Sequence, residues 1–302
     1  MQTVNEFYKS IFGCKVYKIS LDAGCTCPNR DGTLGRGGCL FCGSQGSGDF
    51  VADKNLSVTE QVSAARKLVD PKSAASLKYI AYFQNFTNTY GDLEVLTAKW
   101  REALACENVV GLALGTRPDC ISQECLAVLA AFVRQGFFVQ LELGFQTACE
   151  ETAEFFHRGY KNEVYFDAVK RIHKAAPGVH VVTHVMFGLP CGDEPESSEQ
   201  MMDSVRSVVD AGSDGIKIVN LYILKGSGFE KFYRQSSLRL LEYKEYLGLV
   251  SRALQLLPER MVVHRLAGDP DHKNLVAPAW CSDKKRILND LNKLFAELNC
   301  DC

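Results

Sequence analysis

Short apolar runs rich in β-branched residues alternate with longer segments of helical periodicity, and this alternation constrains the fold most strongly. We expect strands at 14–22, 78–83, 109–115, 137–144, 179–188 and 215–224, and helices at 57–70, 93–105, 125–135, 149–157, 163–174 and 198–212. Successive strand–helix–strand units form parallel sheets through right-handed crossovers, so the chain is predicted to be an α/β protein. Periodicity alone leaves two architectures open, a doubly wound sheet and a full or partial (β/α) barrel.

The pattern changes after residue 225. We expect a helix at about 240–256, a strand at 260–266 and a terminal helix at 283–298. This succession indicates a C-terminal α/β extension, so the predicted domains are residues 1–225 and 226–302. The chain has 302 residues, 46 % of them apolar, which is ample for a core of this size.

Charge and targeting signals narrow the function classes. The net charge of −2 shows no global basic excess, so a nucleic-acid or membrane site would have to be a local patch. The first ten residues lack a basic-then-apolar export signal, and no apolar run approaches the roughly 20 residues of a transmembrane helix. We therefore expect a soluble, cytoplasmic protein without a membrane partner.

The chain contains 13 cysteines, an odd number in a long sequence without an export signal, which argues against a disulfide framework. Most of them lie singly in apolar surroundings, where a thiol behaves as a small buried hydrophobe. We interpret eight in this way: Cys14, Cys106, Cys120, Cys125, Cys149, Cys281, Cys300 and Cys302.

A Gly-rich loop after the first expected strand differs from these, because it holds four cysteines within residues 25–42. Cys27, Cys39 and Cys42 are spaced C-x11-C-x2-C, and Cys25 adds a C-x-C pair. A structural zinc site needs four nitrogen or sulfur ligands, and no histidine lies nearby to complete one. Three good ligands suit an iron–sulfur cluster with one open iron. The spacing leaves a cluster, zinc, and redox or disulfide chemistry as alternatives, while the position at the ligand-binding edge of a parallel sheet favours a chemical role.

The segment CPNRDGTLGRGGCLFC (27–42) resembles the YhcC/YtqA-like (MnmL-type) radical S-adenosylmethionine (SAM) enzymes, relatives of the Elongator catalytic subunit and of oxygen-independent coproporphyrinogen oxidase. The resemblance continues in order through YFQNFTNTYG, GTRPDC, LELGFQT, HRGY, MFGLP, LYILKGSGFEKFY, HRLAGDP and APAW. It implies a partial (β/α)6 TIM-like radical SAM barrel, open on one side, with the C-terminal α/β extension. It also implies a [4Fe–4S] cluster on Cys27, Cys39 and Cys42, with Cys25 outside the ligand set.

In such enzymes the cluster and SAM supply the chemistry, a 5′-deoxyadenosyl radical that abstracts hydrogen from the substrate, while the protein positions them and excludes water. By resemblance, Gln146 contacts the ribose of SAM and Arg158 its carboxylate. Gly115 and His184 depart from the relatives' pattern, which has acidic residues at both positions, so the polar contacts are partly rebuilt. The further candidates for cofactor contact are Phe41, Gln84, Asn88, Thr89, Thr116, Glu142 and His184.

Candidates for substrate contact lie further along the chain. Lys217, Asn220 and Lys225, on or after the sixth strand, could meet an anionic substrate group. His264 and Arg265 belong to a C-terminal motif that, by resemblance, covers the barrel mouth or binds substrate.

The resemblance implies a tRNA substrate, with conversion of the 5-substituent of wobble uridine from carboxymethylaminomethyl to aminomethyl. An electron donor such as flavodoxin or ferredoxin is then an expected partner, besides SAM and tRNA. Two alternatives remain: a radical SAM enzyme acting on a small metabolite or peptide, and a non-catalytic zinc or iron–sulfur binding protein.

Overall fold

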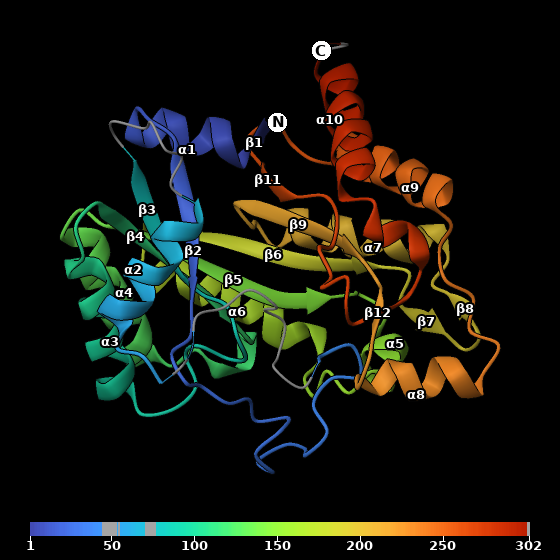
Figure 1. Ribbon diagram of the computed structural model, residues 1–302, viewed down its shortest axis with the longest axis horizontal. Coiled ribbons are helices and arrows are strands. Elements are labelled where there is room, and N and C mark those ends of the chain that lie inside the picture. Colours follow the sequence, from blue (N-terminus) through green and yellow to red (C-terminus); the bar gives the residue numbers. More distant parts are fainter. Residues whose placement is uncertain (44–52, 54, 70–76, 301–302) are drawn as a thin grey trace.

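The computed structural model describes residues 1–43, 53, 55–69 and 77–300, except for the side chains of residues 299 and 300 (Figure 1). Predictions that concern Asp70, Cys302 and the side chain of Cys300 therefore lie outside the described residues.

One parallel sheet organises the described chain. Its eight strands, in spatial order, are β1 (Gln2–Thr3), β11 (Val262–Arg265), β9 (Gly215–Asn220), β6 (Val179–Phe187), β5 (Phe138–Gln146), β4 (Val109–Thr116), β3 (Lys78–Phe83) and β2 (Val16–Leu21). Every neighbouring pair is parallel. Among the described strands, β1 and β2 are the two edges and do not pair with each other, so the curved sheet is a half-barrel. This confirms the partial barrel and excludes the doubly wound alternative.

The helices follow the strands as expected. They are α1 (Val4–Phe12), α2 (Val58–Val69), α3 (Leu93–Ala105), α4 (Gln123–Arg134), α5 (Glu150–Phe155), α6 (Asn162–Ala175), α7 (Ser198–Asp210), α8 (Gly228–Gln235), α9 (Tyr243–Gln255) and α10 (Lys284–Cys300). Figure 1 shows α2, α3 and α4 grouped at one end of the sheet, and α7, α9 and α10 at the other. Among the helices that the structure describes, none is both long enough and apolar enough to cross a bilayer.

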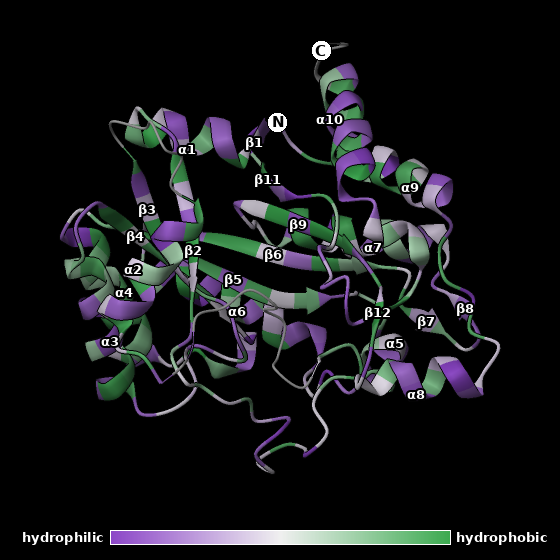
Figure 2. Cartoon of the chain, in the orientation of Figure 1, coloured by the Kyte–Doolittle hydropathy of each residue, from purple (hydrophilic) through white to green (hydrophobic). Residues whose placement is uncertain are grey.

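Local sequence explains where several helices begin. The Ser197 side chain accepts a hydrogen bond from the backbone of Gln200, whose side chain in turn accepts from the Ser197 backbone, and this capping box starts α7. Asp92 caps α3 by accepting from two backbone N–H groups of the first turn. Figure 2 shows polar and apolar bands alternating along α8 and α10, as expected for helices that bury one face only.

The N-terminal helix α1 was not predicted. It closes the half-barrel at the amino ends of the strands. It contacts both β2 and β11, strands near opposite edges of the sheet. Its Tyr8 is buried in a cluster with Val16, Ile80, Tyr82 and Ala113, against which further aromatic rings of α1 pack. These side chains fill the interior at the amino ends of the strands and seal it from solvent.

The C-terminal region extends the sheet as well as following it. The strand β11 pairs in parallel with β9, and β1 pairs with β11, so the main sheet continues beyond residue 225. Two short strands, β10 (Ile223–Leu224) before residue 225 and β12 (Leu275–Ala277) after it, pair antiparallel. A small hairpin of β7 (Pro190–Cys191) and β8 (Glu194–Pro195) precedes α7. The domain boundary at 225 stays a prediction.

Candidate active site

A cavity of about 230 Å³ lies inside the half-barrel, toward the carboxyl ends of the strands. Parallel barrels bind their ligands at this end, because the loops after the strands converge there. The predicted site residues that line it are Cys27, Cys39, Phe41, Cys42, Gln84, Thr116, Glu142, Gln146, Arg158, His184, Lys217, Asn220 and Arg265. The alternation of strand side chains aims Glu142, His184 and Lys217 inward from β5, β6 and β9.

The cysteine loop lines part of the cavity and packs on the segment after α5. The Asn29 amide donates to the His157 carbonyl at 2.7 Å and to the Cys39 sulfur at 3.4 Å. Arg30 donates to the Gly43 carbonyl at 2.7 Å. Gly38 has a φ of 75°, and a Cβ there would lie 2.9 Å from Arg30 Nε, so the loop needs glycine at this point.

The residues present fit the iron–sulfur cluster that the resemblance implies. Cys27, Cys39 and Cys42 line one cavity, and two arginines lie close by. The contact with the Cys42 thiol lowers the pKa of Cys39, and the Arg117 and Arg30 charges lower it further. Together they outweigh burial, which raises this pKa, and the result is a pKa of about 7. A lowered pKa favours the thiolate, the form that binds iron.

Two further observations bear on the ligand set. Among the described residues, no three His, Cys, Asp or Glu side chains gather closely enough to hold a single metal ion. The cysteines of a cluster bind different irons, so they need not converge on one point. Cys25 does not line the cavity; it packs against the main core, and burial raises the pKa of its thiol to about 11. The assignment of the three ligands stays a prediction.

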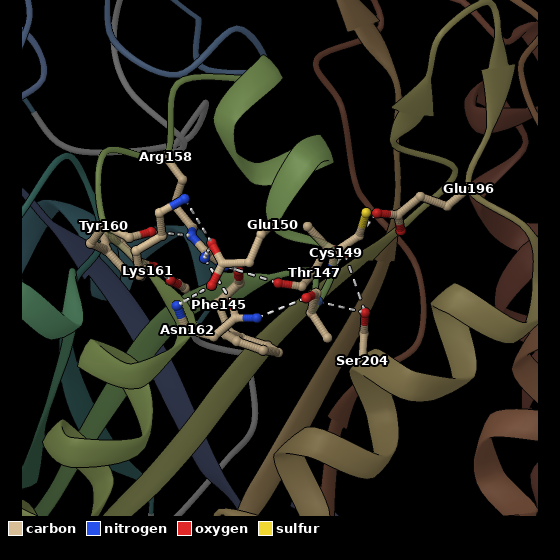
Figure 3. A network of polar contacts seen from close by, with 12 residues as sticks. Phe145, Thr147, Cys149, Glu150, Arg158, Tyr160, Lys161, Asn162, Glu196 and Ser204 are labelled. Carbon is tan, nitrogen blue, oxygen red and sulfur yellow. Dashed lines mark hydrogen bonds and ion pairs between the residues drawn. The ribbon is translucent and has the colours of Figure 1, made fainter.

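Arg158 is 1 % exposed, and its donors are engaged within the protein (Figure 3). Its acceptors are the carbonyls of Phe145 (3.0 Å), Thr147 (2.9 Å) and Tyr160 (3.0 Å) and the side chains of Asn162 (2.7 Å) and Glu150 (3.4 Å). Arg158 thus braces the turn after β5. A SAM carboxylate, the predicted partner of Arg158, would have to compete with these acceptors.

Gln146 ends β5 with a φ of 64°, a left-handed conformation that costs a residue other than glycine about 1 kcal/mol or more. A Cβ on Gly144 would lie 2.5 Å from a terminal atom of the Gln146 side-chain amide, so Gly144 makes room for this side chain beside the cavity. The amide is oriented so that its nitrogen donates to the carbonyls of Gly144 (3.2 Å) and Phe145 (3.0 Å). The strained backbone therefore holds a polar side chain at the cavity wall, where the ribose contact was predicted.

Four predicted residues do not line the cavity: Asn88, Thr89, Lys225 and His264. The buried Asn88 amide donates to the carbonyls of Phe83, Asn85 and Gly115, and the Thr89 hydroxyl meets that of Thr116 at 2.6 Å. Lys225 donates to the Lys273 carbonyl at 3.1 Å, and the ring of His264 meets that of His180 at 3.0 Å. These hydrogen bonds stabilise the residues around the cavity. A role in cofactor binding for Asn88 and Thr89, and in substrate binding for Lys225 and His264, stays a prediction.

Part of the cavity wall is a polar cluster around Glu142, which is 1 % exposed. We call Lys18, Tyr82, Glu142, His184 and Lys217 the floor network. One carboxylate oxygen accepts from Lys18 at 2.8 Å, and the other from Tyr82 at 2.6 Å, from His184 at 2.9 Å and from Lys217. Five strands contribute to this network, so the curvature of the sheet assembles it.

Burial and neighbouring charges shift the pKa values of the floor network. Burial opposes ionisation, but the Lys18 and Lys217 charges and the His184 hydrogen bond hold the pKa of Glu142 well below its usual range. Burial lowers the pKa of His184, and the Lys217 charge adds to this effect. The imidazole is therefore neutral near pH 7, and its Nε2–H donates to the carboxylate. Burial, with the Lys18 and Arg265 charges, lowers the pKa of Lys217 to about 7 despite its contact with Glu142.

Several residues that line the cavity were not predicted from the sequence as site residues, including Arg30, Tyr82, Arg117, Tyr160 and Tyr222. A signal existed for Tyr82, since it follows the inward-facing Ile80 by two positions on β3. Arg117 stands in the quoted GTRPDC segment, where it pairs with Asp119 at 2.8 Å.

The chain matches two sequence profiles. The profile of the radical SAM superfamily covers residues 27–202, and that of the radical SAM C-terminal domain covers residues 213–297. The chain is similar to YtqA of Bacillus subtilis, with 37 % identity over 96 % of this chain and 88 % of YtqA. A shorter match joins it to a tRNA-2-methylthio-N(6)-dimethylallyladenosine synthase of Carboxydothermus hydrogenoformans, 26 % identical over 41 % of this chain and 25 % of the synthase.

Among solved structures, the fold resembles the archaeal Elp3 of Methanocaldococcus infernus, with a TM-score of 0.64 and 16 % identity. The similarity covers 92 % of this chain and 63 % of that structure, and at this identity it supports the fold alone. The profile match, together with the long alignments to YtqA and to YhcC of Escherichia coli, shows that the chain is an enzyme of the radical SAM superfamily and belongs to its YtqA/YhcC family.

Proposed function

We propose that this radical SAM enzyme acts on the wobble uridine of tRNA and converts a carboxymethylaminomethyl group at position 5 to aminomethyl. The observation that carries the proposal is that the three cysteines line the same cavity as Tyr82, Glu142, His184 and Lys217 of the floor network. A substrate group bound in this cavity would meet both the cofactors and these polar side chains. The matched synthase, whose name states that it acts on a tRNA base, supports a nucleic-acid substrate.

Each part of the chain has a defined task in this proposal. Cys27, Cys39 and Cys42 would hold a [4Fe–4S] cluster, which together with SAM supplies a 5′-deoxyadenosyl radical for hydrogen abstraction. Gln146 would orient SAM at the end of β5. The helix α1 excludes water from below, which protects a reactive intermediate from side reactions. An electron donor of the flavodoxin or ferredoxin class completes the proposal.

Anaerobic purification tests the cofactor assignment. We expect a brown protein with about four irons per chain that is bleached by dithionite and releases 5′-deoxyadenosine from SAM. Cys27→Ala, Cys39→Ala and Cys42→Ala should each lose the colour, while Cys25→Ala should keep it. A colourless protein that contains zinc would contradict the cluster.

Nucleoside analysis of tRNA tests the substrate. Cells that lack the gene should accumulate 5-carboxymethylaminomethyluridine and lose the aminomethyl form, and the purified enzyme should convert one to the other. Production of 5′-deoxyadenosine with unchanged tRNA nucleosides would instead favour a small metabolite or a peptide as substrate.

A further inference from the structure

Charge is distributed unevenly around the cavity. Among the described residues that line it, five side chains are cationic and Glu142 is the only carboxylate. The cationic residues are Arg30, Arg117, Arg158, Lys217 and Arg265. A half-enclosed site of this kind attracts anions, because its low-dielectric walls concentrate the field.

The three arginines nearer the cysteine loop are already engaged by the protein. Arg30 donates to the Gly43 carbonyl, Arg117 pairs with Asp119, and Arg158 braces the turn after β5. Their charges lie near Cys39, where a bound cluster and the SAM carboxylate would add negative charge. Of the remaining two cations, Lys217 belongs to the floor network and Arg265 lies beside it.

Lys217 and Arg265 stand directly beside each other, because they are register partners on the parallel strands β9 and β11. Both line the cavity, and the Arg265 charge is one of those that disfavour the protonated form of Lys217. Like charges on neighbouring strands destabilise a sheet unless an anion lies between them. Glu142 cannot serve both, since Lys18, Tyr82, His184 and Lys217 already occupy its oxygens.

The side chain of Arg265 makes no hydrogen bond or ion pair with the residues that the structure describes, and it is solvent-accessible. A guanidinium offers a planar pair of donors that matches a carboxylate. Such a pair of donors beside a second cation, at the wall of a cavity, is an arrangement complementary to a carboxylate.

We propose that Lys217 and Arg265 form an anion subsite that binds the carboxylate of the substrate's base substituent. This inference rests on the proposed function and adds to it the residues that select the substrate. The subsite holds a carboxylate rather than a phosphate, because Lys217 shares its charge with Glu142 and a dianion would crowd that carboxylate. Lys217 is also only 8 % exposed, so a bulky backbone phosphate would not reach it.

The subsite also favours release of the product. The aminomethyl product has lost the whole carboxymethyl group, the carboxylate included, and keeps a positively charged amine. Near Lys217 and Arg265 that amine is repelled, so substrate and product differ in affinity in the direction that turnover requires.

Binding of two matched RNAs tests the subsite. Each is a short anticodon stem-loop; one carries 5-carboxymethylaminomethyluridine and the other 5-methylaminomethyluridine, which lacks only the carboxylate. We expect the reconstituted enzyme to bind the first about tenfold more tightly, the factor expected for one charge-assisted contact. Arg265→Gln should reduce this ratio to about threefold or less, and Lys217→Met should do the same.

Matched controls separate the subsite from general charge. Arg101→Gln and Lys244→Met remove the same kinds of side chain from the exposed faces of α3 and α9 and should leave the ratio unchanged. At constant ionic strength, N-acetylglycine should compete with the carboxylate RNA better than inorganic phosphate does. Phosphate as the stronger competitor would overturn the carboxylate assignment.

The outcomes distinguish this inference from the proposed function. If both RNAs bind equally well, or if Arg265→Gln leaves the ratio at its original value, the anion subsite is wrong while a tRNA substrate stands. If neither RNA binds, the tRNA substrate is wrong, and NMR titration with N-acetylglycine decides the subsite. Weaker binding to Arg265→Gln than to wild type would then support it, and equal binding would refute it.

Discussion

Replacement of Glu142 by glutamine should destabilise the protein strongly, because the carboxylate is the shared acceptor of the floor network. Its oxygens accept from Lys18, Tyr82, His184 and Lys217, and the residue is 1 % exposed. The amide keeps the shape but removes the negative charge and turns an NH₂ group toward donors. The amines of the partly buried Lys18 and the buried Lys217 then lose their common carboxylate partner.

The expected loss in the free energy of unfolding is about 3 kcal/mol or more, the range for removing one partner of a buried ion pair. A second variant combines Glu142→Gln with Lys217→Met. Removing Lys217 relieves the repulsion that Glu142→Gln creates, so the double variant should be at least as stable as Glu142→Gln alone. The two changes should therefore be coupled by about 1–3 kcal/mol.

Urea unfolding followed by circular dichroism, at neutral pH under reducing and anaerobic conditions, measures both quantities. Glu259→Gln, an exposed change of the same type, serves as the control and should lie within about 0.5 kcal/mol of wild type. Strictly additive effects of Glu142→Gln and Lys217→Met would refute the idea of a shared counterion. A loss below about 1 kcal/mol for Glu142→Gln would show that water reaches the network.

Three further predictions follow from individual contacts. Burial lowers the pKa of Lys217 to about 7 from an ordinary value of 10.5. Between pH 7 and pH 10.5 the unfolded chain therefore binds more protons than the folded protein. Stability should thus rise from pH 7 toward pH 10 more steeply in wild type than in Lys217→Met, and parallel pH profiles would contradict this. Arg158→Lys should cost about 2–3 kcal/mol in urea unfolding, since lysine cannot reach all the acceptors of the guanidinium; a neutral effect would show that the brace is dispensable. Gly144→Ala should displace the Gln146 side chain and weaken SAM binding about tenfold in calorimetry, whereas Gly248→Ala, with open space around it, should not. Unchanged SAM affinity in Gly144→Ala would remove Gln146 from the SAM site.

The order of strands and helices could be predicted because each of the six units carries its own periodicity and length. The sequence could not reveal that β11 joins the main sheet, since a four-residue strand carries no information about its partner. The helix α1 was missed because it is only nine residues long and precedes the first predicted strand. Its role depends on aromatic rings that meet residues of β2, β3 and β4, and no local pattern records such contacts.

The candidate site divides in the same way. The cysteine loop could be found because its ligands lie within one short segment of chain. The floor network could not, because Lys18 and Glu142 are separated by 124 positions and Lys217 and Glu142 by 75. Arg158 shows a third case. Its residue type and position pointed to the cavity, but only the structure reveals that its donors are occupied by the turn after β5.

The packing inside the half-barrel explains why the floor network can hold separated charges. The aromatic rings of α1 pack in one cluster with Tyr82 of the floor network, and Phe7 stacks on His180 of β6. The rings exclude water from below, and ion pairs are stronger where water is scarce. The cavity side stays open, so Lys217 can exchange part of its contact with Glu142 for a contact with a ligand. A sealed network would bind no substrate, and a fully hydrated one would discriminate weakly between a carboxylate and an amine.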